Sequence, residues 1–178
     1  AVLAAVAARR RVPLIHFSTD YVFDGQGRTP YREDDPVAPA SAYGRSKLAG
    51  ERAVAASGAH HYVLRTSWVY GLRGRNFLVT MARLACERPE LRVVDDQVGA
   101  PTSARAIAHG TEALVEQILR GAAPRPGVYH MSCAGQTTWC GFARAIVRRL
   151  PEIAPLLGLS APSTSPAVTA ITTADYPT

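Results

Sequence analysis

Two short apolar runs that end in polar residues are the clearest hydrophobic pattern in the chain. Residues 13–17 are apolar except for His16 and end in the polar residues 18–20, and residues 62–66 end in a similar way. Apolar runs of this length are typical of strands buried in a sheet. Open α/β sheets bind ligands at the carboxyl ends of their strands. We therefore expect functional groups at these two strand ends.

A helical pattern separates the two runs. Ser41 is a typical N-cap residue, the pattern continues to about residue 56, and Gly58 stops it. Strand, helix and strand in this order predict a parallel, right-handed crossover unit. Residues 24–39 precede the helix and are rich in Pro, Gly and acidic residues, so we expect a long loop there.

The rest of the chain repeats this mixture of helical and strand patterns. We expect helices at residues 1–8, 76–87, 103–119 and 137–150, strands at residues 91–94 and 128–131, and a linker at residues 121–127. Residues 151–178 are rich in Pro, Ser, Thr and Ala and lack a clear period, so we expect this end of the chain to be loop-rich. The pattern as a whole predicts an α/β fold.

Composition narrows the class of protein. A chain of 178 residues with 47% hydrophobic content suits one domain or slightly more. Its net charge of +6 comes mostly from scattered arginines without a long basic run or interleaved aromatic residues, which argues against nucleic-acid binding. No segment is long and apolar enough for a membrane span. Three widely spaced cysteines, Cys86, Cys133 and Cys140, suit reduced thiols in the cytoplasm and lack the spacing of a metal site.

The candidate chemistry begins with Tyr43 and Lys47. A spacing of four residues places both side chains on one face of the expected helix. A fixed cation beside a phenol favours the phenolate and lowers a phenol pKa from about 10, so such a tyrosine can act as a general acid. Lys47 is the only lysine in the chain, which makes a chance spacing less probable than a functional one. A surface helix with a solvated lysine is the alternative.

Four motifs extend this reading over nearly the whole chain. They are Ser-Thr-Asp-Tyr-Val-Phe-Asp-Gly at residues 18–25, Tyr-Gly-Arg-Ser-Lys-Leu-Ala-Gly-Glu at 43–51, Arg-Thr-Ser-Trp-Val-Tyr-Gly at 65–71 and Asp-Gln-Val-Gly-Ala-Pro-Thr at 96–102. In this order they resemble the dTDP-4-dehydrorhamnose reductases, a family of extended short-chain dehydrogenase/reductases. The resemblance implies reduction of the C4 keto group of dTDP-4-dehydro-L-rhamnose by NADPH or NADH, giving dTDP-L-rhamnose.

The resemblance also implies roles for individual residues. Tyr43 would donate a proton to the C4 oxygen, and Lys47 would bond the nicotinamide ribose. Thr19 would hydrogen-bond the carbonyl and tune Tyr43, and Ser18 would lie with Tyr43 and Lys47 at the cofactor. Ser18 and Thr19 are also common turn residues, so a turn without chemistry is the alternative for both.

Substrate contacts are implied at both strand ends and in a later loop. Asp20 and Trp68 would contact the sugar, since an aromatic face suits the apolar side of a deoxysugar. Core packing is the alternative for Trp68, and turn formation for Asp20. The loop residues with implied substrate contacts are Gln97 and Thr102, together with Asp96 and Pro101, although a polar loop before a helix cap explains them nearly as well.

The fold implied by the family is the C-terminal part of a Rossmann-like doubly wound parallel sheet with a small α/β substrate-binding subdomain. We expect a partial nucleotide-binding domain with interleaved substrate-binding segments at residues 1–126, and the small substrate-binding subdomain, incomplete at its end, at 127–178. The chain contains no Gly-x-x-Gly-x-x-Gly fingerprint, so we expect the pyrophosphate site upstream of it. We then expect the strand at residues 13–17 to lie at an exposed edge, and the isolated chain to bind NAD(P)H negligibly and to be poorly soluble or oligomeric.

Two other classes of function stay open. The first is another nucleotide-sugar reductase, epimerase or dehydratase of the extended family, which would share Tyr43 and Lys47. The second is a non-catalytic regulatory subunit of methionine adenosyltransferase, which is similar to this family. A homodimer of the full-length protein and the choice between NADH and NADPH also stay open.

Overall fold

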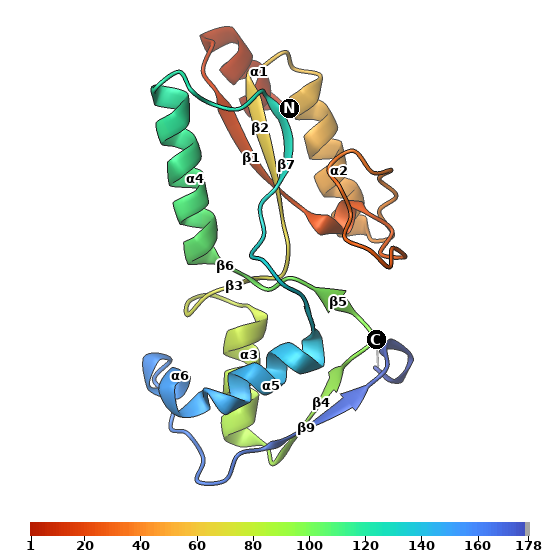
Figure 1. Ribbon diagram of the computed structural model, residues 1–178, viewed down its shortest axis with the longest axis vertical. Helices are drawn as coiled ribbons and strands as arrows, with labels where there is room; N and C mark the ends of the chain where they lie inside the picture. Colours follow the sequence, from red (N-terminus) through yellow and green to blue (C-terminus); the bar gives the residue numbers. More distant parts are fainter. Residues whose placement is uncertain (177–178) are drawn as a thin grey trace. The chain divides into compact units, whose positions relative to one another are not determined.

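The computed structural model describes residues 1–176, and the chain forms two compact units (Figure 1). The first contains Ala1–Ser67 and Ile107–Ser132, and the second contains Trp68–Ala106 and the chain from Cys133 onward. This division differs from the expected boundary between residues 126 and 127. The strand β7 (Gly127–His130) pairs with β2 (His61–Thr66), so it belongs to the first unit and not to the second.

The first unit is built on a three-stranded parallel sheet in the order β1-β2-β7. The strand β1 (Leu14–Thr19) is the apolar run expected at residues 13–17, and β2 is the run expected at 62–66. Within the described chain β1 pairs with β2 alone and lies at the edge of the sheet. Their register places Ser18 opposite Arg65 and Thr19 opposite Thr66, so the polar ends of both strands lie at one end of the sheet.

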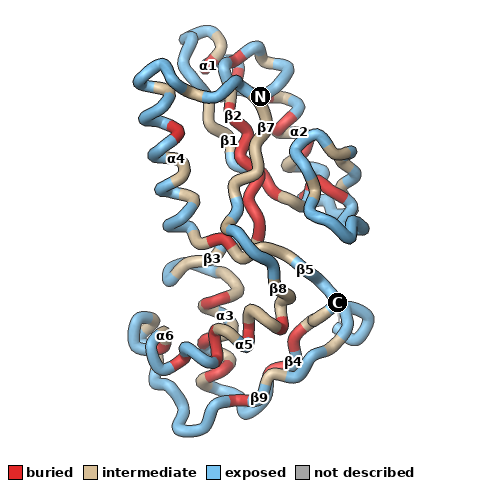
Figure 2. The backbone as a smooth tube through the Cα atoms, viewed as in Figure 1, coloured by how far each residue is buried: buried red, intermediate tan, exposed pale blue. Residues whose placement is uncertain are grey.

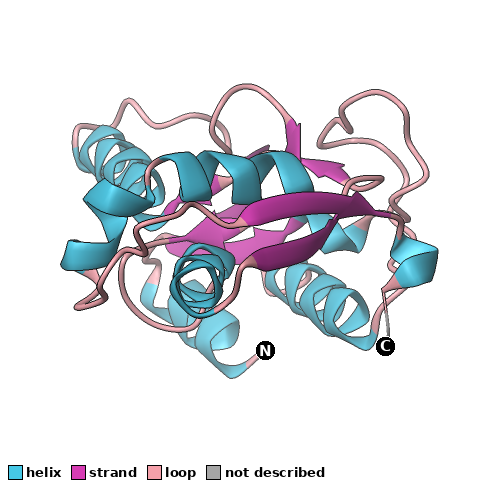
Figure 3. Cartoon of the chain, turned by 90° about the horizontal axis from the view of Figure 1, so that it is seen from below, coloured by secondary structure: helices cyan, strands magenta, loops and turns pink. Residues whose placement is uncertain are grey.

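Helices cover both faces of this sheet because successive side chains of a strand point to opposite sides. Val63 of β2 packs with α1 (Val2–Arg10) and α2 (Ala42–Ala55). Its neighbours Tyr62 and Leu64 pack instead on α4 (Ala104–Leu119) through Leu114. Figure 1 shows α4 on one side of these strands and α2 on the other, and Figure 3 draws the helices and strands in a second view. The α/β crossover predicted from the sequence is confirmed, since β1, α2 and β2 follow one another and the strands are parallel.

The ends of α2 follow the expected capping residues. The Ser41 hydroxyl accepts a hydrogen bond from the backbone N–H of Gly44 at 3.0 Å, which satisfies one of the free donors of the first turn. Beyond the helix, Gly58 adopts a φ of 71°, a left-handed conformation that favours glycine. Residues 24–39 contain no helix or strand, as expected, and Phe23 stacks on Tyr31 at a ring distance of 4.4 Å.

The second unit combines short strands with three helices. Two of its strand pairs are parallel, namely β3 (Val69–Tyr70) with β6 (Thr102–Ser103) and β4 (Glu90–Val94) with β9 (Ala167–Ile171). A third pair, β5 (Val98–Gly99) with β8 (Thr137–Thr138), is antiparallel. The helices α3 (Phe77–Glu87), α5 (Trp139–Arg148) and α6 (Leu150–Leu156) supply most of its core, whose buried positions are red in Figure 2.

The end of the chain corrects one sequence expectation. Residues 151–176 are not mainly loop, because they contain most of α6, the strand β9 and the 3-10 helix η2 (Thr173–Asp175). The sequence did not indicate these elements, because α6 is short and contains Pro155. The strand β9 is exposed or half-buried along its length, so it lacks the apolar run of a buried strand. The helix expected at residues 137–150 begins instead at Trp139 and ends at Arg148, and α6 starts just after it.

None of the helices in residues 1–176 is long and apolar enough to cross a membrane.

Candidate active site

Tyr43 and Lys47 lie in the first two turns of α2, as the sequence predicted. The Tyr43 side chain is open to solvent, with 55% of the residue exposed. Lys47 is half-buried, and its Nζ donates a hydrogen bond to the backbone carbonyl of Phe17 at 2.6 Å. Because Phe17 is near the carboxyl end of β1, this bond holds the ammonium at the strand end, on the same helix face as the phenol.

Thr19 and Asp20 form a small hydrogen-bonded group where β1 ends. The Thr19 hydroxyl accepts from the backbone N–H of Tyr21 at 3.2 Å and donates to Asp20 Oδ1 at 3.1 Å. The other oxygen of Asp20 accepts from the Ser67 hydroxyl at 2.7 Å. Both residues therefore shape the turn, as the alternative interpretation held. A substrate carbonyl would compete with Asp20 for the Thr19 hydroxyl hydrogen.

Ser18 points into the interior of the first unit. Only 4% of the residue is exposed, and its hydroxyl donates to the carboxylate of Glu51. The same carboxylate accepts two hydrogen bonds from the guanidinium of Arg65. Sequence reasoning missed Glu51 and Arg65. A signal was present, because a charged residue in the apolar run at residues 62–66 needs a buried partner.

Tyr21 is a second phenol beside the candidate acid. Its ring meets the Tyr43 ring edge-on, with centroids 6.1 Å apart and an interplanar angle of 86°. Burial raises the pKa of Tyr21, and the charges of Asp20 and Tyr43 raise it further. Tyr21 therefore keeps its proton at neutral pH. Sequence analysis gave it no role, although it belongs to the motif at residues 18–25.

Gly44 lets the start of α2 approach the backbone of Tyr21. A Cβ at Gly44 would overlap the Tyr21 carbonyl oxygen. We expect Gly44→Ala to lower the free energy of unfolding by about 1–3 kcal/mol, because backbone atoms have to shift to relieve the overlap. Urea denaturation of the full-length gene product, with and without the substitution, measures this difference.

Gly50→Ala is the matched control for Gly44→Ala. Gly50 lies in the same helix, but its Cβ would meet only the flexible His16 ring, at 3.3 Å. Alanine also has the higher helix propensity, by about 1 kcal/mol. We expect Gly50→Ala to be neutral or stabilising. Equal losses in the two variants would show that the close approach at Tyr21 is not what requires glycine.

In the second unit, Trp68 is held by an aromatic partner that the sequence did not suggest. Its ring stacks on Trp139 with centroids 3.5 Å apart and planes inclined by 7°. Trp68 has a φ of 42°, and a Cβ on Gly99 would overlap its indole. Trp68 is half-buried, so packing accounts for part of its surface and leaves the remainder accessible.

The loop residues with expected substrate contacts are engaged within the second unit. Gln97 accepts from Trp139 Nε1 at 3.2 Å and donates to the Thr173 hydroxyl at 3.0 Å. Thr102 is 1% exposed, and its hydroxyl donates to the Ala100 carbonyl and accepts from the backbone N–H of Cys133. Side-chain and backbone hydrogen bonds from Thr173 hold the pKa of Asp96 below its usual value. These contacts fit the alternative of an ordered polar loop.

The sequence profile described as RmlD substrate binding domain matches residues 1–178. The chain belongs to this family.

Two relatives of this RmlD-family chain are named dTDP-4-dehydrorhamnose reductase. The dTDP-4-dehydrorhamnose reductase of Burkholderia thailandensis is 53% identical over 161 residues, which are 87% of this chain and 54% of the relative. The reductase of the same name from Escherichia coli strain K12 is 42% identical over 93% of this chain and 53% of the relative. The chain thus spans about half the length of the curated relatives it matches.

Solved structures agree with the fold. The crystal structure of dTDP-4-dehydrorhamnose reductase from Bacillus anthracis in complex with NADP has a TM-score of 0.84 and 33% identity, covering 98% of this chain and 56% of that one. The orthologue from Clostridium acetobutylicum has a TM-score of 0.80 and 38% identity over the same shares. The family resemblance and the Rossmann-like α/β fold class predicted from the sequence are confirmed.

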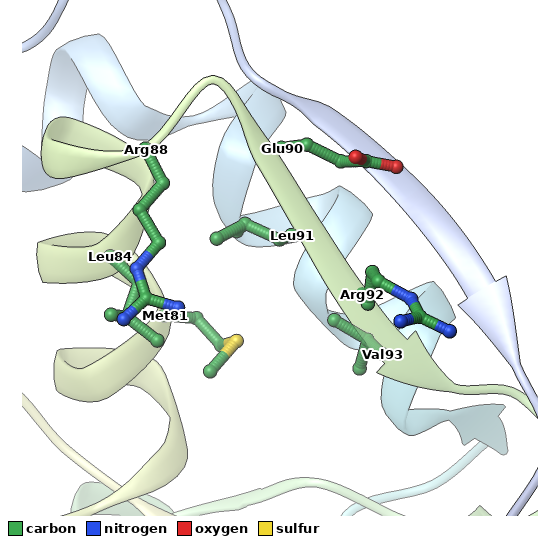
Figure 4. A pocket seen from close by; sticks show the side chains of 7 residues that line it. All are labelled: Met81, Leu84, Arg88, Glu90, Leu91, Arg92 and Val93. Atoms are coloured by element: carbon green, nitrogen blue, oxygen red, sulfur yellow. The ribbon is translucent and has the colours of Figure 1, made fainter. Parts of the chain in front are cut away.

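One hollow of the second unit contains none of the residues with predicted chemistry. It has a volume of about 230 Å³ and is lined by Met81, Leu84, Arg88, Glu90, Leu91, Arg92 and Val93, between α3 and β4 (Figure 4). None of the predicted site residues lines it. We therefore base the candidate site on the hydrogen-bonded groups around α2 and the end of β1.

Proposed function

We propose that this chain carries the proton-donating centre of an NAD(P)H-dependent reductase that converts dTDP-4-dehydro-L-rhamnose into dTDP-L-rhamnose. The observation that carries the proposal is the anchored Lys47, whose Nζ bonds the Phe17 carbonyl on the helix face of the exposed Tyr43. The family match and the names of the relatives support the same reaction. Free Cys86, Cys133 and Cys140 support a reducing compartment such as the cytoplasm.

Tyr43 is the proposed general acid. When bound, a reduced nicotinamide supplies the hydride that C4 of the sugar receives. The phenolic hydrogen of Tyr43 passes to the C4 oxygen, and the ketone becomes a secondary alcohol while a phenolate remains on Tyr43. The ammonium of Lys47 stabilises that phenolate by its charge. Solvent returns the proton to Tyr43 after the reaction.

Lys47 fits a second role toward the cofactor. An ammonium has three donors, and among the described residues one of these is used, on the Phe17 carbonyl. The other two are available for ribose hydroxyl groups. The residues present therefore fit the nicotinamide end of the cofactor, whereas the glycine-rich motif that binds a pyrophosphate does not occur in this sequence. The Ser18 hydroxyl donates to the carboxylate of Glu51. Ser18 would therefore affect the cofactor site indirectly, through Glu51, and not by contacting the cofactor itself.

Trp68 is the proposed sugar contact of the second unit. We expect Trp68→Ala to raise the KM for the sugar nucleotide about 10-fold while the KM for NADPH changes by less than about 2-fold, because an aromatic platform binds the apolar side of a sugar ring. Steady-state kinetics with each ligand varied in turn measures both constants. Equal changes in the two constants, with a large loss of thermal stability, would identify Trp68 as a core residue stacked on Trp139.

Product analysis with a panel of nucleotide sugars tests the proposed function. We expect the full-length gene product to oxidise NADPH with dTDP-4-dehydro-L-rhamnose and to leave UDP-glucose, UDP-glucuronic acid and dTDP-glucose unchanged. Epimerised or dehydrated products would assign the chain to another reaction of the extended family. Absence of turnover with every sugar, together with binding to methionine adenosyltransferase, would instead favour a regulatory subunit.

A further inference from the structure

Three side chains of α2 lie in one row with different surroundings. Tyr43, Lys47 and Glu51 are spaced four residues apart, so they occupy one face of the helix. Exposure falls along the row, from 55% at Tyr43 to 5% at Glu51. The proposed acid therefore lies at the open end of the row, and a buried carboxylate lies at the closed end.

Glu51 binds both neighbouring strands of the sheet through one carboxylate. Its Oε1 accepts from the Ser18 hydroxyl of β1 and from Arg65 Nε of β2 at 3.1 Å, and its Oε2 accepts from Arg65 Nη2 at 2.8 Å. Ser18 and Arg65 are register partners in the sheet. The carboxylate thus holds α2 against one cross-strand pair at the end of the sheet.

Arg65 is itself fixed from another direction. Its Nη1 donates to the Glu33 carbonyl at 3.2 Å, and its guanidinium lies over the Phe23 ring, 5.0 Å from the centroid. The Glu51–Arg65 pair is almost fully enclosed, with side-chain exposures of 6% and 5%. Buried ion pairs of this kind can specify a geometry without adding stability over an apolar pair. The arginine is therefore a rigid point to which the helix is attached.

Two bonds attach this face of α2 to consecutive residues of β1. Lys47 binds the Phe17 carbonyl, and one helical turn later Glu51 binds the Ser18 hydroxyl. Movement of α2 along the strand would break both bonds. The position of the Lys47 ammonium at the strand end consequently depends on the bonds of Glu51.

We propose that Glu51 is a positioning residue, which acts through Ser18 and Arg65 to set the place of Tyr43 and Lys47 relative to the end of β1. This inference rests on the proposed function. A displacement of about 1 Å at a reacting group can cost on the order of 10²-fold in rate, so a residue two turns from Tyr43 can control the rate without touching the substrate.

Glu51→Gln in the full-length gene product tests the inference. The amide keeps the volume, but in either orientation its NH₂ group faces an N–H donor of Arg65 and cannot accept from it. We expect kcat to fall by about 10- to 100-fold and both KM values to stay within about 2-fold. Val54→Ala is the matched control, because Val54 is buried on the same helix, packs on Ala4 and Val63, and makes no polar bond to β1.

The outcomes separate positioning from stability. If Val54→Ala lowers the melting temperature at least as much as Glu51→Gln but keeps kcat within about 3-fold of the parent, the loss in Glu51→Gln comes from position. Equal kcat losses in the two variants, or an unchanged kcat in Glu51→Gln, would overturn the inference.

A crystal structure of the Glu51→Gln variant tests the positioning role of Glu51 without an activity measurement. We expect the Lys47 bond to the Phe17 carbonyl to be broken or Tyr43 to be displaced by about 1 Å. Parent-like positions of both side chains would overturn the inference even if the enzyme is a reductase. Failure of the parent protein to reduce the sugar would refute the proposed function and would leave this structural result to decide the positioning role.

Discussion

Tyr43→Phe is expected to lower kcat by on the order of 10² or more, because the variant loses the phenolic hydrogen that the C4 oxygen receives. Cofactor affinity should stay nearly unchanged, since the ring and Lys47 remain. Steady-state kinetics of the full-length gene product gives kcat, and NADPH fluorescence titration gives the affinity. Parent-like turnover would remove Tyr43 from the mechanism.

Tyr21→Phe is the matched control for Tyr43→Phe. It removes the same hydroxyl group from the ring that meets Tyr43 edge-on. Because burial raises the pKa of Tyr21, this phenol is poorly suited to release a proton, and we expect a loss of kcat below about 10-fold. A larger loss than in Tyr43→Phe would show that Tyr21 is the acid.

Lys47→Arg should also reduce turnover, although the charge is retained. The planar guanidinium cannot occupy the place of the ammonium that bonds the Phe17 carbonyl at 2.6 Å. We expect a loss of about 10-fold or more in kcat/KM with NADPH varied. Unchanged kinetics would show that a positive charge is sufficient and that the anchored position has no effect.

Arg65→Ala is expected to produce the largest loss of stability, about 3–5 kcal/mol in the free energy of unfolding. Removing the guanidinium leaves the carboxylate of Glu51 buried and without its charged partner. The Glu33 and Phe23 contacts of Arg65 are lost as well. Urea denaturation of the purified full-length gene product at constant ionic strength measures the difference.

Arg120→Ala is the control for Arg65→Ala. Arg120 pairs with Glu116 at 3.2 Å, but both side chains are mostly exposed. Surface pairs of this kind contribute about 0–1 kcal/mol. If Arg65→Ala costs no more than Arg120→Ala, the buried pair is not a major contributor to the fold, and the attachment of α2 through Glu51 would need another explanation.

The sequence predicted the elements of the first unit because their signals are local. The apolar run of β1, the Ser41 cap and the stop after α2 each depend on residues close together in the chain. Tyr43 and Lys47 were found for the same reason, since one helix carries both. The resemblance to a family added the reaction, and the family is confirmed.

The remaining features depend on contacts between distant residues. The Glu51 carboxylate accepts hydrogen bonds from Ser18 and Arg65, which are 33 and 14 residues away in the sequence. No local sequence pattern predicts partners at such separations. The strand β9 pairs with β4 across a long separation and is not strongly apolar. The expected boundary at residue 127 separates β7 from the sheet of the first unit, because the pairing of β7 with β2 joins residues that are distant in the sequence.

Transfer of a labelled hydride tests the central claim most directly. The full-length gene product is incubated with dTDP-4-dehydro-L-rhamnose and NADPH that carries deuterium at the transferring position of the nicotinamide, and the sugar product is examined by NMR. The account predicts dTDP-L-rhamnose with deuterium bound to C4, formed in equal amount to the NADP⁺, and almost none in the Tyr43→Phe variant over the same time. Deuterium at another carbon, an unlabelled product, or equal labelling by the variant would contradict it.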